Sequence, residues 1–147
     1  NCRFGDPETQ VVLPLLESDL LKIMQACTNG TLADTEVKFS DGAACCVILA
    51  SGGYPVSYEK GKPISGLTDG QLAGEADITV YHSGTAIRED GTLVTNGGRV
   101  LGVTATAPRL TAAITKAYAA TEKIGFEKLH KRMDIGLRAL KAIAEKE

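Results

Sequence analysis

The spacing of apolar residues predicts helices toward both ends of the chain and strands between them. Apolar side chains recur every three to four residues in three segments, residues 18–29, 108–118 and 137–147, which is the spacing of an amphipathic helix. Ser18 is a suitable N-cap for the first segment, Asn29-Gly30 a typical helix end, and Pro108 a suitable opening for the second. The final segment predicts a last helix.

The middle of the chain has the patterns of short strands. Residues 43–50 and 100–105 are continuous apolar runs, and residues 78–82 alternate apolar and polar side chains,. Residues 85–88 and 92–95 flank Glu89-Asp90-Gly91, which predicts a hairpin, and residues 37–39 predict a further short strand. We therefore expect an α+β fold, built on a small antiparallel β-barrel or sandwich of the barrel-sandwich hybrid kind with flanking helices.

The first ten residues gather more chemically versatile side chains than any other stretch. Asp6-Pro7-Glu8 predicts a helix start, with Asp6 as N-cap and Pro7 at the first helical position,. The preceding loop then brings Asn1 and Arg3 toward the helix N-terminus, where a metal or a phosphate finds suitable partners. An ordinary capped turn with surface charges explains the same residues.

A second candidate is the loop Asn96-Gly97-Gly98-Arg99. Paired glycines let the backbone approach a ligand closely, and a guanidinium binds carboxylate or phosphate in a bidentate manner. The alternative is a tight turn ahead of a strand, with Arg99 paired to a nearby acid. Lys60-Gly61-Lys62 also suits a phosphate, although the pattern favours a solvated loop.

Composition excludes several classes of protein. The 147 residues carry a net charge of -2, with basic residues concentrated after residue 108 but interleaved with acids; we expect a solvated helix face there and no nucleic-acid partner. No apolar run approaches the roughly 20 residues of a membrane helix. The four cysteines lack metal-site spacing, and we expect a reduced, cytoplasmic chain without a zinc site.

Four motifs resemble one enzyme family. The opening Asn-Cys-Arg-Phe-Gly-Asp-Pro-Glu-Thr-Gln is similar to the segment closing the ATP-grasp domain of the phosphoribosylamine–glycine ligases (glycinamide ribonucleotide synthetases). Residues 50–55 (ASGGYP), 82–85 (HSGT) and 95–104 (TNGGRVLGVT) resemble the C-terminal domain of the same family. The resemblance implies that residues 1–35 are the end of an ATP-grasp domain, with its closing helices, and that residues 36–147 are the C-terminal barrel-like domain.

The resemblance also implies an activity, a carbon–nitrogen ligation in purine biosynthesis. ATP would phosphorylate the carboxylate of glycine, and the amine of 5-phosphoribosylamine would attack the glycyl phosphate. Mg²⁺ or Mn²⁺ would neutralise the phosphates. Asn1 is implied as a metal ligand and Arg3 as the catalytic group that holds the glycine carboxylate or acyl phosphate. Asp6 and Glu8 would shape the loop and approach the substrate, and Gly97, Gly98 and Arg99 would contact the sugar phosphate.

The chain also departs from the family's pattern. The Glu that normally joins the Asn on the metal, and the nucleotide site, are expected to precede Asn1 in a longer enzyme; the chain alone is predicted to be inactive. Lys131 stands where the family usually has an aromatic residue, in the motif Tyr-Arg-x-Asp-Ile-Gly. This departure weakens any role of the loop in stacking against a ligand. Arg132 and Asp134 of the motif are present. The alternative function is a non-catalytic packing or interaction module of an ATP-grasp carboxylase or ligase.

Overall fold

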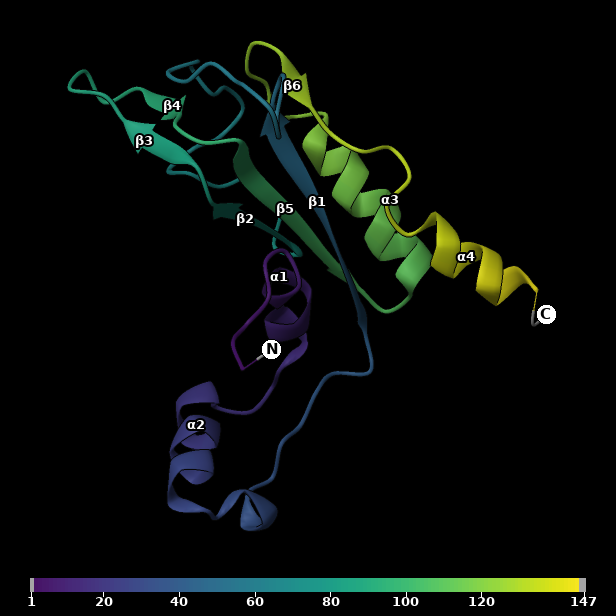
Figure 1. Cartoon of the computed structure of the whole chain (residues 1–147). Coiled ribbons are helices and arrows are strands. Elements are labelled where there is room, and N and C mark those ends of the chain that lie inside the picture. Colours follow the sequence, from purple (N-terminus) through teal and green to yellow (C-terminus); the bar gives the residue numbers. More distant parts are fainter. Residues whose placement is uncertain (1, 146–147) are drawn as a thin grey trace.

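The computed structural model describes residues 2–145, which form an open antiparallel sheet with helices packed against it and an N-terminal segment that extends away (Figure 1). The elements in chain order are α1 (Thr9–Val12), η1 (Leu13–Leu15), α2 (Leu20–Asn29), η2 (Leu32–Asp34), β1 (Ala43–Ser51), β2 (Ile78–His82), β3 (Thr85–Ile87), β4 (Leu93–Thr95), β5 (Arg99–Ala107), α3 (Leu110–Thr121), β6 (Leu129–His130) and α4 (Leu137–Ala144).

The main sheet has the strand order β2-β5-β1-β6, and every pairing in it is antiparallel. The two nine-residue strands β1 and β5 form its centre, and β3 and β4 form a separate hairpin. The antiparallel α+β fold and the hairpin were thus predicted correctly. The closed barrel was wrong: in the described part of the chain the main sheet has four strands, too few to close around a filled interior.

The core lies between the sheet and α3. Leu49 and Val103, on the two central strands, are fully buried, and so are Ala113 and Ala117 on the helix. Alanines at i and i+4 keep that helix face flat, so the helix approaches the sheet closely. Burying each large aliphatic side chain contributes about 1.5–3 kcal/mol, which makes β1, β5 and α3 the stable centre of the molecule.

The N-terminal segment, residues 2–42, meets the sheet through α1 and η1, which contact β1 and β5. Beyond them the chain continues into α2, which lies apart from the sheet in Figure 1. Gly30 ends α2 in a left-handed conformation, φ 72°, as the sequence predicted,. Residues 15–17 then pair with residues 38–40 as the chain returns toward β1.

Three local predictions in this segment were wrong. Helix α1 begins at Thr9 with Glu8 at the N-cap, because Asp6 is drawn into an ion pair elsewhere. Asp19, not Ser18, caps α2: its carboxylate accepts hydrogen bonds from the Leu21 and Lys22 amides.

The third wrong prediction is the strand at residues 37–39, which makes a single bridge, Leu16 to Phe39. The hydroxyl of Ser18 accepts a hydrogen bond from the Lys38 amide at 2.7 Å and so replaces a ladder contact there. At the other end of the chain, α4 begins at Leu137 as predicted, and its last expected residues lie outside the described range. None of the described helices is long and apolar enough to cross a membrane.

Candidate functional site

Three glycine-containing loops meet at one end of the main sheet, where β1 ends, β2 ends and β5 begins. Ser51, at the end of β1, is buried, and it joins two of them. Its amide donates to the carbonyl of Gly98 and its hydroxyl to the carbonyl of Gly97, both at 2.8 Å. The antiparallel order of the sheet brings these ends together, although they are far apart in the sequence.

The glycines allow these loops to touch through their backbones. A Cβ added to Gly84 would lie 2.5 Å from the Arg99 carbonyl oxygen and 2.7 Å from the Cα of Gly97. A Cβ added to Gly98 would lie 2.1 Å from the ring of Tyr54. No side chain fits at such distances, so Gly84, Gly97 and Gly98 are required for the loops to pack.

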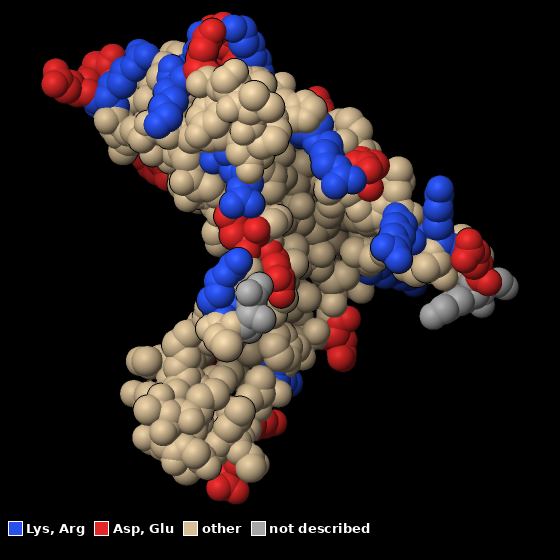
Figure 2. Space-filling view, in the orientation of Figure 1, with Lys and Arg blue, Asp and Glu red and all other residues tan. Residues whose placement is uncertain are grey.

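Arg99 leaves this cluster and reaches the N-terminal segment. Its Nη2 lies 2.8 Å from Oδ2 of Asp6, and its Nη1 donates to the Asp6 carbonyl oxygen at 3.3 Å. Figure 2 shows acidic and basic side chains side by side at the waist where that segment meets the sheet. Arg99 is therefore paired with an acid, which is the alternative to ligand binding that the sequence analysis gave for this loop. The acid, Asp6, belongs to the other candidate stretch, the first ten residues.

The remaining residues of the opening stretch are less engaged. Arg3 is exposed and donates to the carbonyl of its neighbour Phe4 at 3.1 Å. Glu8 is exposed and folds back over Gly5, where an added Cβ would collide with its carboxylate. Asn1 lies outside the described residues. The structure thus brings Asp6 to Arg99, and leaves Arg3 and Glu8 exposed.

Sequence reasoning missed three residues that shape this region: Ser51, Tyr54 and Gln10. Ser51 and Tyr54 lie within the ASGGYP motif, and an aromatic residue beside paired glycines was a usable signal. The rings of Tyr54 and Tyr58 lie 6.1 Å apart at 60° and form a wall over Gly98. No local pattern singled out Gln10, which donates from Nε2 to Oδ1 of Asp6 at 2.9 Å.

Ion pairs fasten the loop that carries these tyrosines. Glu59 pairs with Lys62 at 2.7 Å and Lys128 at 3.0 Å, and Lys62 also contacts Glu127. The hydrogen bonds from Lys62 and Lys128 lower the pKa of the Glu59 carboxyl to about 2. Lys62, considered for phosphate binding, is therefore already occupied by two carboxylates.

The charged side chains around Lys131 are also paired with one another and with α3. Lys131 donates to Thr121 at 2.7 Å and pairs with Glu122 at 2.5 Å. Arg132 donates twice to Asp134, at 2.9 and 2.6 Å, and this keeps the pKa of that carboxyl below its usual range. Arg132 and Asp134 hold this loop together, and no hydrogen bond or ion pair joins their side chains to the described glycine loops.

The described residues do not assemble a metal site on their own. No three His, Cys, Asp or Glu side chains within residues 2–145 gather closely enough to hold an ion. Asp6, the carboxylate nearest the candidate site, is occupied on both oxygens, by Arg99 and by Gln10. The expected metal ligand, Asn1, is not among the described residues.

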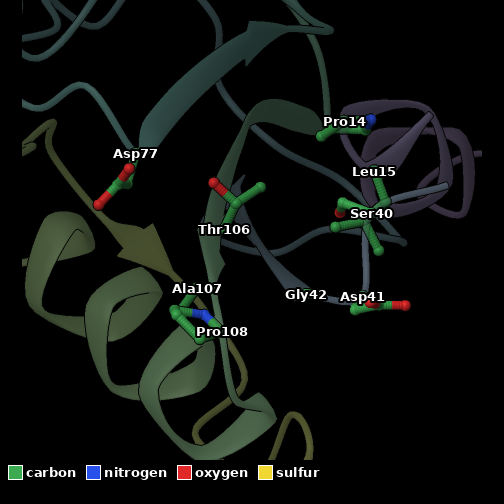
Figure 3. A pocket seen from close by; sticks show the side chains of 9 residues that line it. All are labelled: Pro14, Leu15, Ser40, Asp41, Gly42, Asp77, Thr106, Ala107 and Pro108. Carbon is green, nitrogen blue, oxygen red and sulfur yellow. The ribbon is translucent and has the colours of Figure 1, made fainter. Parts of the chain in front are cut away.

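Two further hollows lie beside the sheet, the first at the end opposite the glycine cluster and the second next to Gly84. One, of about 490 Å³, lies where η1, the start of β1 and the end of β5 meet (Figure 3). Its charged side chains are Asp41 and Asp77, so it does not suit an anionic substrate. The other, of about 900 Å³, lies beneath the β3–β4 hairpin and is open. His82 on its wall is engaged on both ring nitrogens, by Thr85 and by the Gly70 carbonyl.

Comparison with known proteins identifies one family. The family model described as "Phosphoribosylglycinamide synthetase, C domain" matches residues 44–138. The chain is 48% identical to a phosphoribosylamine–glycine ligase of Synechocystis over 95% of its length, covering 33% of that protein. It is 47% identical to the trifunctional purine biosynthetic protein adenosine-3 of Gallus gallus over 99% of its length, covering 14% of that protein.

A solved structure supports the same relationship. The crystal structure of phosphoribosylamine–glycine ligase from Thermotoga maritima matches with a TM-score of 0.69 and 36% identity, over 92% of this chain and 32% of that one. The chain spans a third or less of the length of these relatives. The match includes the glycine cluster and the loops that build it.

Proposed function

Because the chain belongs to the phosphoribosylglycinamide synthetase C domain family, we propose that it is the C-terminal part of an ATP-dependent phosphoribosylamine–glycine ligase of de novo purine biosynthesis. The whole enzyme would join glycine to 5-phosphoribosylamine through glycyl phosphate, and would release glycinamide ribonucleotide, ADP and phosphate. The Asp6–Arg99 ion pair is the observation that carries this proposal. It brings the opening stretch and the Gly-Gly-Arg loop, two motifs of the same family resemblance, to one place.

The proposal divides the chain at residue 35. Residues 1–35 would close the ATP-grasp domain, and residues 36–147 would form the C-terminal domain. Exposed apolar side chains on the N-terminal segment support this division, since Leu21 is 63% and Met24 44% exposed. Such side chains suit a surface that packs against the preceding part of the enzyme.

Within the proposed enzyme, each site residue has a role that matches its position. Arg3, exposed beside Asp6, would be the catalytic guanidinium that holds the glycine carboxylate or the acyl phosphate as charge develops. Asp6 and Glu8 would approach the substrate from the same loop. Arg99 uses one N–H on each of Nη1 and Nη2 toward Asp6. A guanidinium has five N–H donors, so others remain for the sugar phosphate beside Gly97 and Gly98.

ATP and Mg²⁺ or Mn²⁺ belong to this proposal as co-substrate and metal, with Asn1 as a ligand. A divalent ion would neutralise the phosphates of ATP. The described residues supply no site for it. We also propose a cytoplasmic location, which the four free cysteines support,.

The decisive experiment uses the full-length ligase that contains this chain. Arg99→Ala and Arg3→Ala are each expected to lower kcat/KM about 100-fold, because each removes a charged hydrogen bond to an anionic group. Arg138→Ala, an exposed arginine on α4, is the matched control. Unchanged activity in both site variants would refute the assignment of these residues.

A second test addresses the chain itself. We expect it neither to bind Mg-ATP measurably in calorimetry nor to form glycinamide ribonucleotide. Micromolar binding of Mg-ATP would contradict the proposal that the nucleotide site lies in the rest of the enzyme and not in this chain.

The alternative function is a non-catalytic packing module of an ATP-grasp carboxylase or ligase. The Asp6–Arg99 pair fits this alternative as well, because an ion pair can join two parts of a protein without contacting a substrate. The two proposals diverge in the Arg99→Ala experiment. A packing module would lose stability without a selective rise in the KM for 5-phosphoribosylamine.

A further inference from the structure

Gln10 lies one helical turn after Asp6 and completes the contacts of its carboxylate. Oδ1 of Asp6 accepts from Nε2 of Gln10 at 2.9 Å, while Oδ2 lies 2.8 Å from Nη2 of Arg99. The carboxylate is thus held from two sides. Its orientation, and with it the direction of the Arg99 guanidinium, depends on both contacts.

The carboxylate also fixes which way the Gln10 amide points. An amide oxygen facing Oδ1 would place two acceptors against each other, so the nitrogen must face Asp6. The amide oxygen, Oε1, then points the opposite way. It is buried and has no hydrogen-bond partner among the described residues, whereas buried acceptors in folded proteins nearly always have one.

A cavity adjoins this amide. It has a volume of about 270 Å³ and lies between α1 and the end of β2, lined by Gly5, Thr9, Gln10, Leu13, Tyr81, His82 and Ser83. Two of its polar side chains are engaged elsewhere. The Thr9 hydroxyl donates to the Gly5 carbonyl, and both ring nitrogens of His82 are occupied. The amide oxygen is shielded from this space, so the contact with Asp6 is what fixes the amide.

We propose that Gln10 is a positioning residue for the Asp6–Arg99 pair. Its amide nitrogen holds one oxygen of the Asp6 carboxylate, and the other oxygen holds Arg99 across the junction between α1 and β5. This inference rests on the proposed function, in which Arg99 contacts the phosphate of 5-phosphoribosylamine. It assigns Gln10 no contact with substrate.

The kinetic experiment compares glutamine variants of the full-length ligase. Gln10→Leu removes the hydrogen bond to Asp6 and is expected to raise the KM for 5-phosphoribosylamine about tenfold, with kcat and the KM for ATP within about twofold of wild type,. Gln10→Glu places a second carboxylate against Asp6 and is expected to raise that KM further. The sugar amine is formed in the assay from ribose 5-phosphate and ammonia.

Two other glutamines separate positioning from a purely structural effect. Gln25→Leu changes an exposed residue on α2 and is expected to leave every constant unchanged. Gln71 makes two hydrogen bonds to Val80, one from its Nε2 to the carbonyl and one from the amide to its Oε1, each at 2.8 Å. Gln71→Leu is therefore expected to lower the unfolding temperature without a selective rise in the KM for 5-phosphoribosylamine.

A KM for 5-phosphoribosylamine unchanged in Gln10→Leu, or raised equally in Gln71→Leu, overturns the positioning role. If wild-type enzyme makes no glycinamide ribonucleotide, the proposed function fails instead. The contact between Asp6 and Arg99 in a Gln10→Leu crystal structure then still tests the positioning.

Discussion

The N-terminal segment and the sheet-bearing remainder of the chain differ sharply in how they are stabilised. Within residues 2–42 only Ala26 is buried, while residues 43–145 contain a continuous core that includes Leu49, Leu101, Val103 and Ala113. Both regions have amphipathic sequence. The difference is that the second region finds partners for its apolar faces within this chain and the first does not. Hydrophobic pattern alone therefore does not say where a face will be buried.

The two regions join at few points, and the joint coincides with the candidate site. α1 and η1 touch β1 and β5, and Asp6 pairs with Arg99 across the contact. On the face shown in Figure 2, the lobe around α2 carries few charged side chains, whereas the rest of the surface carries many. The first region keeps apolar side chains such as Leu21 and Met24 exposed, whereas the second buries its own in one core.

The largest expected effect comes from matched leucines in the two regions. Leu49→Ala in β1 removes a fully buried side chain and is expected to destabilise the chain by about 2–5 kcal/mol,. Leu21→Ala in α2 removes a side chain that is 63% exposed, and is expected to change stability by less than about 0.5 kcal/mol. Urea denaturation of the chain measures both. Equal losses would show that α2 is packed as tightly as the sheet.

Matched cysteines give a smaller effect that depends on pH. Burial raises the pKa of the Cys45 thiol from 9.0 to about 11. Between these values the unfolded chain releases a proton that the folded chain retains, so the free energy of unfolding is expected to fall as pH rises from about 9 to 11. Each pKa unit corresponds to about 1.4 kcal/mol.

The control for this effect lies in the N-terminal segment. Cys45→Ala is expected to flatten the fall in stability over that pH range, and Cys27→Ala, which changes an exposed thiol, is expected to leave it as in wild type. Alkylation gives a second readout: Cys27 is expected to react rapidly in the folded protein and Cys45 only after unfolding. Rapid labelling of Cys45 would contradict its burial.

The ion pair that joins the two regions is expected to contribute less to stability than the buried core residues do. Both side chains of the Asp6–Arg99 pair are partly exposed, at 41% and 38%, so Asp6→Asn is expected to cost no more than about 1 kcal/mol of global stability. Locally, the amides of α1 are expected to exchange with deuterium faster, because α1 loses its tie to β5. Asp34→Asn, in η2, provides the control. Unchanged exchange in α1 would mean that packing alone holds the joint.

The smallest effect is expected inside the N-terminal segment. Glu17 pairs with Lys38 at 2.8 Å, and both side chains are largely exposed. Glu17→Gln is expected to leave the urea midpoint unchanged, because solvent screens the pair and the backbone bond from the Glu17 amide to the Lys38 carbonyl remains,. A clear loss of stability would show that this pair, rather than the backbone, holds the returning chain.

The sequence predicted the parts of the fold that depend on local pattern. The apolar runs predicted β1 and β5, the helical spacing predicted α2 and α3, and Glu89-Asp90-Gly91 predicted the hairpin. It also identified Gly97, Gly98 and Arg99 as a unit, because paired glycines are required where backbones touch. These features depend on the residues themselves and their near neighbours, which a sequence displays directly.

Tertiary structure alone decided the rest. Asp6 is 93 residues from Arg99, so no local pattern revealed that it would leave the N-cap of α1 for that ion pair. Gln10 enters the candidate site only through its hydrogen bond to Asp6. Ser51 enters it only because the end of β1 lies against the loop that carries Gly97 and Gly98. The sequence did not predict that the sheet is open, because the number and order of its strands depend on the whole chain and not on local pattern. Pairing partners are selected by three-dimensional proximity and burial, and the opening stretch joins the candidate site because the sheet places Arg99 beside Asp6.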